Sequence, residues 1–264
     1  VTSGVLIEDR SAPGRGGAPN VDDFDGDGFP EIGAAFGDRY QLVDLQPPTA
    51  ACPAWPNVFV DELTGLQGNV ARTAPSATCA TDADCGDMNQ FACNPQLSQC
   101  VCLHNGWERR TEDDPSRVTG SSVFDFNGDG AAEVVYNDEC WFRVYAGIDG
   151  LVYFKEQSPS RTRTENPIVA DVDNDGNAEI VFGASNESGF CSQGNDFNNG
   201  IEVWGDASDA WVGARRIYNQ HAYHVTNVDP YGTVPRSSEA ALNWLDPELN
   251  DFRKNVQGDA IPGA

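Results

Sequence analysis

The sequence predicts an all-β fold, and three observations lead to this prediction. First, the 264 residues include 27 glycines and 16 prolines, which favour many turns over long helices. Second, short runs that alternate apolar and polar residues recur along the chain, as expected of half-buried strands. Third, a segment with the pattern of a strand, an acidic loop and a second strand occurs three times. We therefore expect strands and loops arranged as a repeat within a single domain over residues 1–264.

The repeated segment first reads APNVDDFDGDGFPEIGAAFG, at residues 18–37. It returns as GSSVFDFNGDGAAEVVYNDE at residues 120–139 and as NPIVADVDNDGNAEIVFGAS at residues 166–185. Each copy has an apolar-alternating run, a loop rich in acidic residues and glycine, and a second run of β-branched or aromatic residues. This pattern predicts strand, loop and strand in each copy.

Further strands are predicted after the second and third copies. CWFRVYAG, a turn at GIDG and LVYFKEQ follow the second copy, and GIEVWG follows the third after a polar loop at residues 186–200. The last two acidic loops lie about 46 residues apart, a length that suits one four-stranded propeller blade. We therefore predict a β-propeller-like array of about four or five such blades, with closure of the ring left open.

The interval between the first and second acidic loops is more than twice as long. We expect it to hold one blade without an acidic loop, around residues 55–73, and a cysteine-rich insertion over residues 76–104. The C-terminal part, residues 206–264, matches the repeat poorly. There we expect one or two strands, with IYNQHAYHVTNV as a strand candidate, and a short helix near SSEAALNWL.

The acidic loops have the composition of a calcium site. Hard cations such as Ca²⁺ take six to eight oxygen ligands, so several carboxylates and a backbone carbonyl must converge on one point. Each loop offers side-chain oxygens at positions one, three, five and nine, and the carbonyl of position seven is expected to point inward. Glycine at position six permits the sharp reversal, since it tolerates a positive φ. The predicted ligands are Asp23, Asp25, Asp27, Phe29 and Glu31; Asp125, Asn127, Asp129, Ala131 and Glu133; and Asp171, Asp173, Asp175, Asn177 and Glu179.

Two alternatives compete with this interpretation. The helical calcium hand ends in a bidentate Glu at position twelve and is flanked by helices. Here position twelve is Ala34, Tyr136 or Phe182, and the flanks AEVVY and AEIVF are β-type, so that alternative fails. Solvated acidic turns are the other alternative, since Asp, Asn and Gly are ordinary turn formers. Three copies with Glu at the same offset favour calcium, with about three ions in all.

The three stretches resemble FG-GAP repeats, also called VCBS repeats, of integrin α-subunit propellers and many bacterial surface proteins. The resemblance covers residues 18–45, 117–157 and 166–205. In that family the acidic loop joins the first two strands of a blade and holds calcium, and the resemblance carries this role over to the residues given above. The FG-GAP signature itself survives only in fragments such as AAFG and VFGAS, and Asn127 replaces an Asp.

The cysteines indicate an oxidising compartment. Their irregular spacing in CATDADCGDMNQFACNPQLSQCVC suits a disulfide knot. Zinc is the alternative, but there is no paired CxxC and the only nearby histidine is His104. We expect a secreted protein, extracellular or at the cell surface, whose export signal has been removed or lies upstream, because VTSGVLIEDR lacks signal-peptide features. The cysteines expected to pair, with the pairing left open, are Cys52, Cys79, Cys85, Cys93, Cys100, Cys102, Cys140 and Cys191.

Charge and motifs narrow the function. A net charge of −25 disfavours nucleic acid and anionic membranes as partners. No G-x-S-x-G, P-loop or dinucleotide fingerprint is present. His221 and His224 would point to opposite faces of a strand, so a shared metal is not expected. The tryptophans fill blade cores more often than they form a sugar-stacking platform.

The sequence therefore predicts a non-catalytic extracellular calcium-binding module for adhesion, recognition or assembly, whose partner is a protein or glycan ligand or a further copy. It does not predict an enzyme or membrane insertion. Two alternatives stay open. One is a structural subunit that polymerises into extracellular fibres through open sheet edges. The other is a carbohydrate-binding or polysaccharide-degrading propeller.

Overall fold

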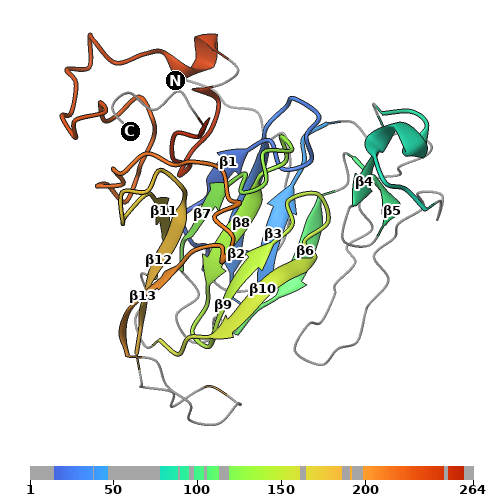
Figure 1. The fold of residues 1–264 in the computed structure, drawn as a ribbon, viewed down its shortest axis with the longest axis horizontal. Coiled ribbons are helices and arrows are strands. Elements are labelled where there is room, and N and C mark those ends of the chain that lie inside the picture. The colour runs from blue at the N-terminus through green and yellow to red at the C-terminus, as the bar shows by residue number, and fades with distance from the viewer. Residues whose placement is uncertain are drawn as a thin grey trace.

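The regular secondary structure of the described residues is almost entirely β-strand. A computed structural model describes residues 15–37, 39–46, 78–88, 90–94, 98–103, 106–112, 119–160, 165–185, 191, 199–246 and 249–258. Within these ranges the strands form two four-stranded sheets, one three-stranded sheet and one two-stranded sheet, with two 3-10 helices (Figure 1). The prediction of an all-β fold is confirmed.

The first sheet takes its fourth strand from the far side of the cysteine-rich insertion. Its order is β1-β2-β3-β6, and all neighbours are antiparallel. Leu42 of β3 pairs with Trp107 of β6, so the long stretch between them is an insertion within one sheet. The strands are β1 (Asn20–Asp22), β2 (Glu31–Phe36), β3 (Arg39–Val43) and β6 (Trp107–Arg110).

The second and third sheets follow the predicted repeats closely. The second has the order β10-β9-β8-β7 and the third has the order β11-β12-β13, again antiparallel. The third sheet thus has one strand fewer than the other two. The strands are β7 (Ser121–Phe124), β8 (Glu133–Asn137), β9 (Trp141–Tyr145), β10 (Val152–Gln157), β11 (Ile168–Ala170), β12 (Glu179–Ala184) and β13 (Gly200–Trp204).

The three sheets stack in chain order. Successive side chains of a strand point to opposite faces, so the middle sheet can pack against a neighbour on each side. On β8, Val134 and Tyr136 belong to the core shared with the first sheet, whereas Val135 belongs to the core shared with the third. The first and second sheets therefore pack directly on each other, and β7 contacts both β1 and β11. The blade predicted around residues 55–73 lies outside the described residues. Closure of the stack into a propeller ring stays a prediction.

The cysteine-rich insertion forms a small unit of its own. A 3-10 helix, η1 (Asp82–Cys85), is followed by the hairpin of β4 (Phe91–Asn94) and β5 (Gln99–Cys102). Its core consists of Phe91 and the cysteines rather than a large apolar cluster. Figure 1 shows this unit at the side of the molecule away from β11 to β13.

The C-terminal part differs from its prediction. Residues 217–228, expected to include a strand, form turns and bends, and the expected helix is reduced to a turn and the 3-10 helix η2 (Asn243–Leu245). The polar residues between the aromatics of this stretch favour turns, and its buried members Tyr223 and His224 make hydrogen bonds instead of pairing in a ladder.

Residues 251–258, hereafter the C-terminal strap, run along the first strands of the sheets. The backbones of Phe252 and Val21 exchange two hydrogen bonds, of 2.7 and 3.2 Å, at β1. The N–H of Val123 on β7 donates to the carbonyl of Arg253 at 3.2 Å. The side-chain amide of Asn255 donates to the carbonyl of Val169 on β11 at 2.9 Å. The strap thus connects the first strands of all three sheets.

Candidate metal centres

The three acidic loops occupy the same place in three sheets. They join β1 to β2, β7 to β8 and β11 to β12, so each loop connects the first strand of its sheet to the second. Each loop begins directly after its first strand with an Asp, and ends with a Glu that is the first residue of the second strand. Equivalent strands therefore present equivalent side chains.

The Asp at position one organises the backbone of its loop. Asp23 accepts hydrogen bonds from the N–H groups of positions four, five and six, at 2.7, 3.1 and 2.8 Å. Asp125 accepts the same three bonds, at 2.7, 3.2 and 3.0 Å. Asp171 accepts the bond from position four at 2.6 Å. These bonds wrap the backbone around the carboxylate and hold it at the centre of the loop.

The reversal of the chain requires glycine at position six, as predicted. Gly28, Gly130 and Gly176 have φ values of +87°, +92° and +101°. A Cβ at any of the three would meet nothing within 4 Å, so the backbone conformation, rather than lack of space, selects glycine there. Position four is also left-handed in each loop, and in the third loop it is Asn174 at +71°.

The Glu at position nine reaches back across the loop. The carboxylates of Glu31, Glu133 and Glu179 accept the N–H of position two at 2.7, 3.0 and 2.8 Å. All three are buried. The second oxygen of Glu31, Oε1, is buried and has no hydrogen-bond partner within the described part of the chain. A buried acceptor without a donor fits a cation ligand.

The carboxylate oxygens converge in two of the loops. Oxygens of Asp23, Asp25 and Asp27 lie within 4.8 Å of one another, and so do oxygens of Asp171, Asp173 and Glu179. Two ligand oxygens on opposite sides of one Ca²⁺ would lie about 4.6–5.2 Å apart. Each of these groups therefore fits around a single ion of that size.

The second loop is closed by a hydrogen bond inside it. The side-chain amide of Asn127 donates from Nδ2 to Oδ2 of Asp129 at 2.9 Å, and its Oδ1 accepts the N–H of Asp129 at 2.9 Å. The Asn at position three therefore both lowers the charge of the loop and engages the carboxylate of position five.

Position seven has an ordered backbone in all three loops. The carboxylates of position five accept the N–H groups of Phe29, Ala131 and Asn177 at 2.7, 2.9 and 2.8 Å. The ring of Phe29 is exposed. Ligation by the carbonyls of these three residues stays a prediction.

The electrostatics of the loops favour a positive counter-ion. Burial, together with the nearby carboxylate of Asp25, raises the pKa of Glu31 to about 10. Burial, with smaller contributions from neighbouring carboxylates, raises the pKa of Glu133 to about 8. Burial also raises the pKa of Glu179 and of Asp23. Without a cation, Glu31 and Glu133 therefore favour the protonated form near neutral pH, and a bound divalent ion would reverse that preference.

The insertion lies against the first two loops. A cavity of about 220 Å³ is lined by Asp25 of the first loop, by Asp129 and Glu133 of the second, and by Asp82 and Phe91 of the insertion. The insertion thus shields part of both loops from solvent. No local sequence pattern predicts this contact, because the insertion and the loops are far apart in the chain.

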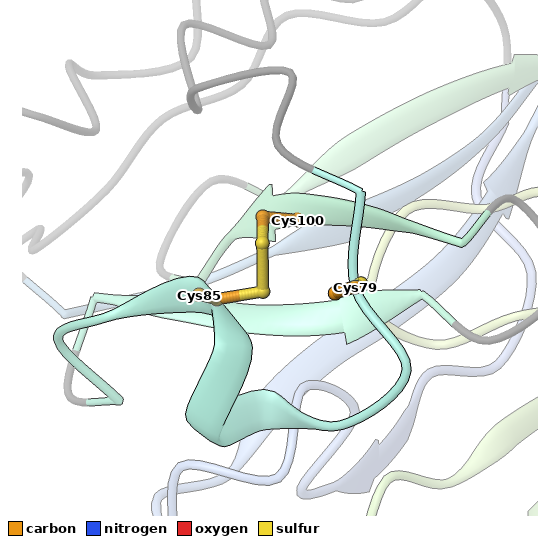
Figure 2. A group of neighbouring side chains, drawn as sticks. All are labelled: Cys79, Cys85 and Cys100. Carbon is orange, nitrogen blue, oxygen red and sulfur yellow. A yellow bond between two sulfur atoms is a disulfide. The ribbon is translucent and has the colours of Figure 1, made fainter.

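The cysteines of the insertion are oxidised. Cys79 pairs with Cys93, and Cys85 pairs with Cys100, as Figure 2 shows for the second bridge. Cys102 is disulfide-bonded as well, and Cys52 lies outside the described residues. The gathering of Cys79, Cys85 and Cys100 therefore reflects disulfides rather than a zinc site.

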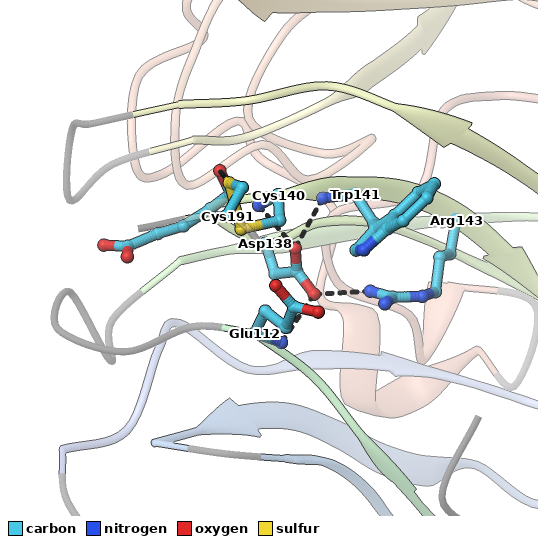
Figure 3. Close-up of a disulfide and its surroundings, with 7 residues drawn as sticks. Glu112, Asp138, Cys140, Trp141, Arg143 and Cys191 are labelled. Atoms are coloured by element: carbon cyan, nitrogen blue, oxygen red, sulfur yellow. Dashed lines mark hydrogen bonds and ion pairs between the residues drawn. A yellow bond between two sulfur atoms is a disulfide. The ribbon is translucent and has the colours of Figure 1, made fainter. Parts of the chain in front are cut away.

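A third bridge, Cys140–Cys191, lies beside a buried ion pair that the sequence did not point to. Figure 3 shows Asp138 accepting a hydrogen bond from Arg143, and both side chains are fully buried. Asp138 also accepts the N–H groups of Cys140 and Trp141 at 2.8 and 2.6 Å. An Asp that starts a turn is common, so nothing in the sequence distinguishes this one.

The histidines and the tryptophan that the sequence also raised as candidates make contacts that support the fold. His224 is buried and lies 3.0 Å from the carbonyl of Leu249, and His221 lies 3.0 Å from a guanidinium nitrogen of Arg253. The metal-ligand groups found among the described residues include no histidine. Trp107 is part of the core between the first two sheets, as expected of a blade-filling tryptophan.

Comparison with known proteins supports the repeat. Residues 115–182 match the FG-GAP-like repeat family, so the predicted resemblance is confirmed for that part of the chain. The chain is also similar to the crystal structure of the V. cholerae biofilm matrix protein Bap1, with a TM-score of 0.51 and 22% sequence identity. The similarity covers 85% of this chain and 27% of Bap1, and it concerns the fold. No curated protein matches the chain. Among the described residues, no helix has the length and hydrophobicity that a membrane span requires.

Proposed function

We propose that this chain is a non-catalytic extracellular module whose stacked sheets are held by about three calcium ions, and that it acts in adhesion or assembly at a cell surface or in a matrix. One observation carries the proposal. Three loops at equivalent places in three sheets combine a backbone-wrapped Asp, a left-handed glycine and a buried Glu that reaches back across the loop.

The metal role we propose is structural. Each loop sets the geometry between the first two strands of its sheet, so an ion bound there fixes how the strands leave the loop. In the absence of the ion, crowded carboxylates repel at short range and destabilise the turn. Three calcium ions would offset six of the 25 net negative charges, so the loaded surface would still be strongly acidic.

Disulfides and the biofilm relative support the extracellular role. Three described bridges are typical of proteins that leave a reducing cytosol. The structural relative is a biofilm matrix protein, which agrees with a role in adhesion or matrix assembly. The absence of a nucleophile or nucleotide signature from the sequence supports a non-catalytic module.

Isothermal titration of the metal-free chain with Ca²⁺ tests the proposal, with Mg²⁺ as the comparison ion. We expect heat that saturates near three ions per chain, a preference for Ca²⁺, and loss of one site in Asp23→Asn. Asp209→Asn, which removes an exposed acid outside the loops, is the matched control and is expected to keep every site. Titration without saturable heat would contradict the proposal.

A further inference from the structure

The third sheet exposes a face that the other two sheets bury. We call the face that each sheet turns towards the next sheet its leading face, and the opposite one its trailing face. Tyr40 of the first sheet and Phe142 of the second lie at equivalent leading positions, opposite the fifth residue of the second strand, and both are 0% exposed. The equivalent residue of the third sheet, Ile201, is 79% exposed.

A second position repeats the pattern. Leu42 and Val144 pair with the third residue of the second strand and are 2% and 6% exposed, because the next sheet covers them. Val203 holds the equivalent place on the third sheet and is 53% exposed. Ile201 and Val203 are apolar, as their buried counterparts are. The leading face of the third sheet thus has the composition of a sheet-to-sheet interface without the covering sheet.

The edge of the third sheet is free as well. In each of the first two sheets, a fourth strand pairs with the outer side of the third strand. In the third sheet, β13 pairs only with β12 among the described strands. β13 lies at the outer edge of the molecule in Figure 1. An uncovered face beside an unpaired edge favours docking of another β-sheet over docking of a small ligand.

The complementary surface is present on the first sheet of the same chain. Val134 and Ile180 are equivalent trailing positions of the second and third sheets, and each is buried against the preceding sheet. Ile32 holds that position on the first sheet and is 38% exposed. The part of this trailing face around Ile32 is therefore open, whereas Gln41 and Glu108, which share the face by register, are 2% and 4% exposed. A docked sheet would meet the first sheet beside β2.

We propose that a second copy of this chain docks head to tail, with the leading face of the third sheet of one copy on the trailing face of the first sheet of the next. This contact would repeat, between two copies, the way in which the first sheet packs on the second sheet and the second sheet packs on the third. It is heterologous, so repetition gives a ring or an open filament. The inference deepens the proposed role in assembly and rests on it.

Charge opposes this contact but does not forbid it. Each copy carries a net charge of −25, so copies repel at low ionic strength. At physiological salt the Debye length is about 8 Å, which limits this repulsion to short range. The leading face carries the uncharged side chains of Ile168, Val181, Ile201 and Val203. Glu179 lies on the same face by alternation, and its carboxylate turns back to accept the N–H of Val172 in the acidic loop.

Sedimentation velocity in calcium and physiological salt tests the proposal, with a concentration series reaching about 100 μM, where a contact with a Kd of that size is half occupied. We expect the average mass to rise with concentration. Ile201→Lys is expected to raise the Kd at least about tenfold, and so is Ile32→Lys. Both add one positive charge, so greater repulsion between copies cannot explain the loss. Val234→Lys, which makes the same change at an exposed residue of the C-terminal part, is expected to associate like the wild type.

A mixture of the two disrupted variants separates head-to-tail docking from other contacts. Ile201→Lys keeps an intact trailing face and Ile32→Lys keeps an intact leading face. One copy of each can therefore dock, but no further copy can add, so the mixture is expected to form dimers and nothing larger. A wild type that stays monomeric throughout would overturn the proposal, as would association that Ile32→Lys leaves unchanged. Calcium titration of the same sample separates the two claims: a calcium-loaded monomer contradicts only this inference, and association without calcium binding contradicts only the metal role.

Discussion

The acidic loops and the C-terminal strap handle buried charge in opposite ways. The loops gather like charges: three carboxylates of the first loop lie within 4.8 Å of one another, with a buried Glu31 beside them. The charged residues of the strap instead find their partners elsewhere in the chain. Lys254 lies 2.9 Å from Asp22, and the fully buried Arg253 donates to the carbonyls of Ser121 and His221 at 3.1 and 3.2 Å. We infer that the loops depend on an external cation and that the strap does not.

The largest effect is expected at the strap. Arg253→Met is expected to lower the free energy of unfolding by about 3–5 kcal/mol, since the buried carbonyl of Ser121 and the part-buried carbonyl of His221 lose their donor and the packing around a fully buried side chain is disturbed. Urea unfolding in calcium and in EGTA should show the same loss. Arg236→Met, at an exposed position, is the matched control and should change stability by less than about 0.5 kcal/mol. A loss seen only in calcium would contradict the independence of the strap.

A change at Glu31 is expected to lower the stability in calcium but not in EGTA. Glu31→Gln keeps an oxygen for the N–H of Phe24 but removes a charged ligand. In calcium at 100 times the Kd, the variant should lose up to about 2.7 kcal/mol of unfolding free energy, the contribution of one bound ion. In EGTA the free energy of unfolding should not fall, because the raised pKa already keeps this carboxyl protonated near neutral pH. Glu239→Gln, an exposed change, should behave like the wild type under both conditions. An equal loss with and without calcium would reduce Glu31 to a structural hydrogen-bond acceptor.

The pH dependence should differ between the two metal states. The pKa of Glu31 rises from 4.5 to about 10 on folding, so the folded state binds more protons than the unfolded state between these values. Without calcium, stability is therefore expected to fall as the pH rises through that window, and Glu133 adds to the fall up to about pH 8. Urea unfolding in EGTA at several pH values measures this slope, which saturating calcium should flatten. A rise in stability with pH in EGTA would contradict the assignment.

The smallest effect is expected in the second loop. Asn127→Asp restores a carboxylate at position three and removes the amide that donates to Asp129. Since ligand charge tunes calcium affinity, we expect the weakest of the calcium sites to bind about tenfold more tightly, which corresponds to about 1.4 kcal/mol. Calorimetric titration resolves the change, and Asn219→Asp, which adds the same charge outside the loops, is the control. Unchanged affinities would show that position three of this loop does not contact the ion.

The loops could be predicted from sequence because their determinants are local. The spacing of Asp23, Gly28 and Glu31 within nine residues fixes which groups meet, and the strand pattern on each side fixes where the loop lies. The fourth strand of the first sheet could not be predicted in the same way. Trp107 pairs with Leu42 across an insertion, and no local pattern specifies a partner so far along the chain.

The turns at residues 217–228 and the buried ion pair escaped prediction for a related reason. Residues 217–228 carry aromatic and β-branched side chains, which favour strands, but tertiary contacts of Tyr223 and Arg253 decide their conformation. Asp138 and Arg143 are five residues apart and resemble any surface pair until the sheets bury them. Disulfide pairing depends likewise on the fold, as Cys140 and Cys191 show at a sequence separation of 51 residues.

The dependence of the unfolding free energy on calcium concentration tests the central claim most directly. If three ions bind the folded chain and not the unfolded one, the free energy should rise by about 4 kcal/mol for each tenfold increase in free calcium above the Kd. Urea unfolding at a series of buffered calcium concentrations measures that slope. We expect a steep rise that Glu31→Gln reduces by about one third. A free energy that does not change with calcium would contradict it.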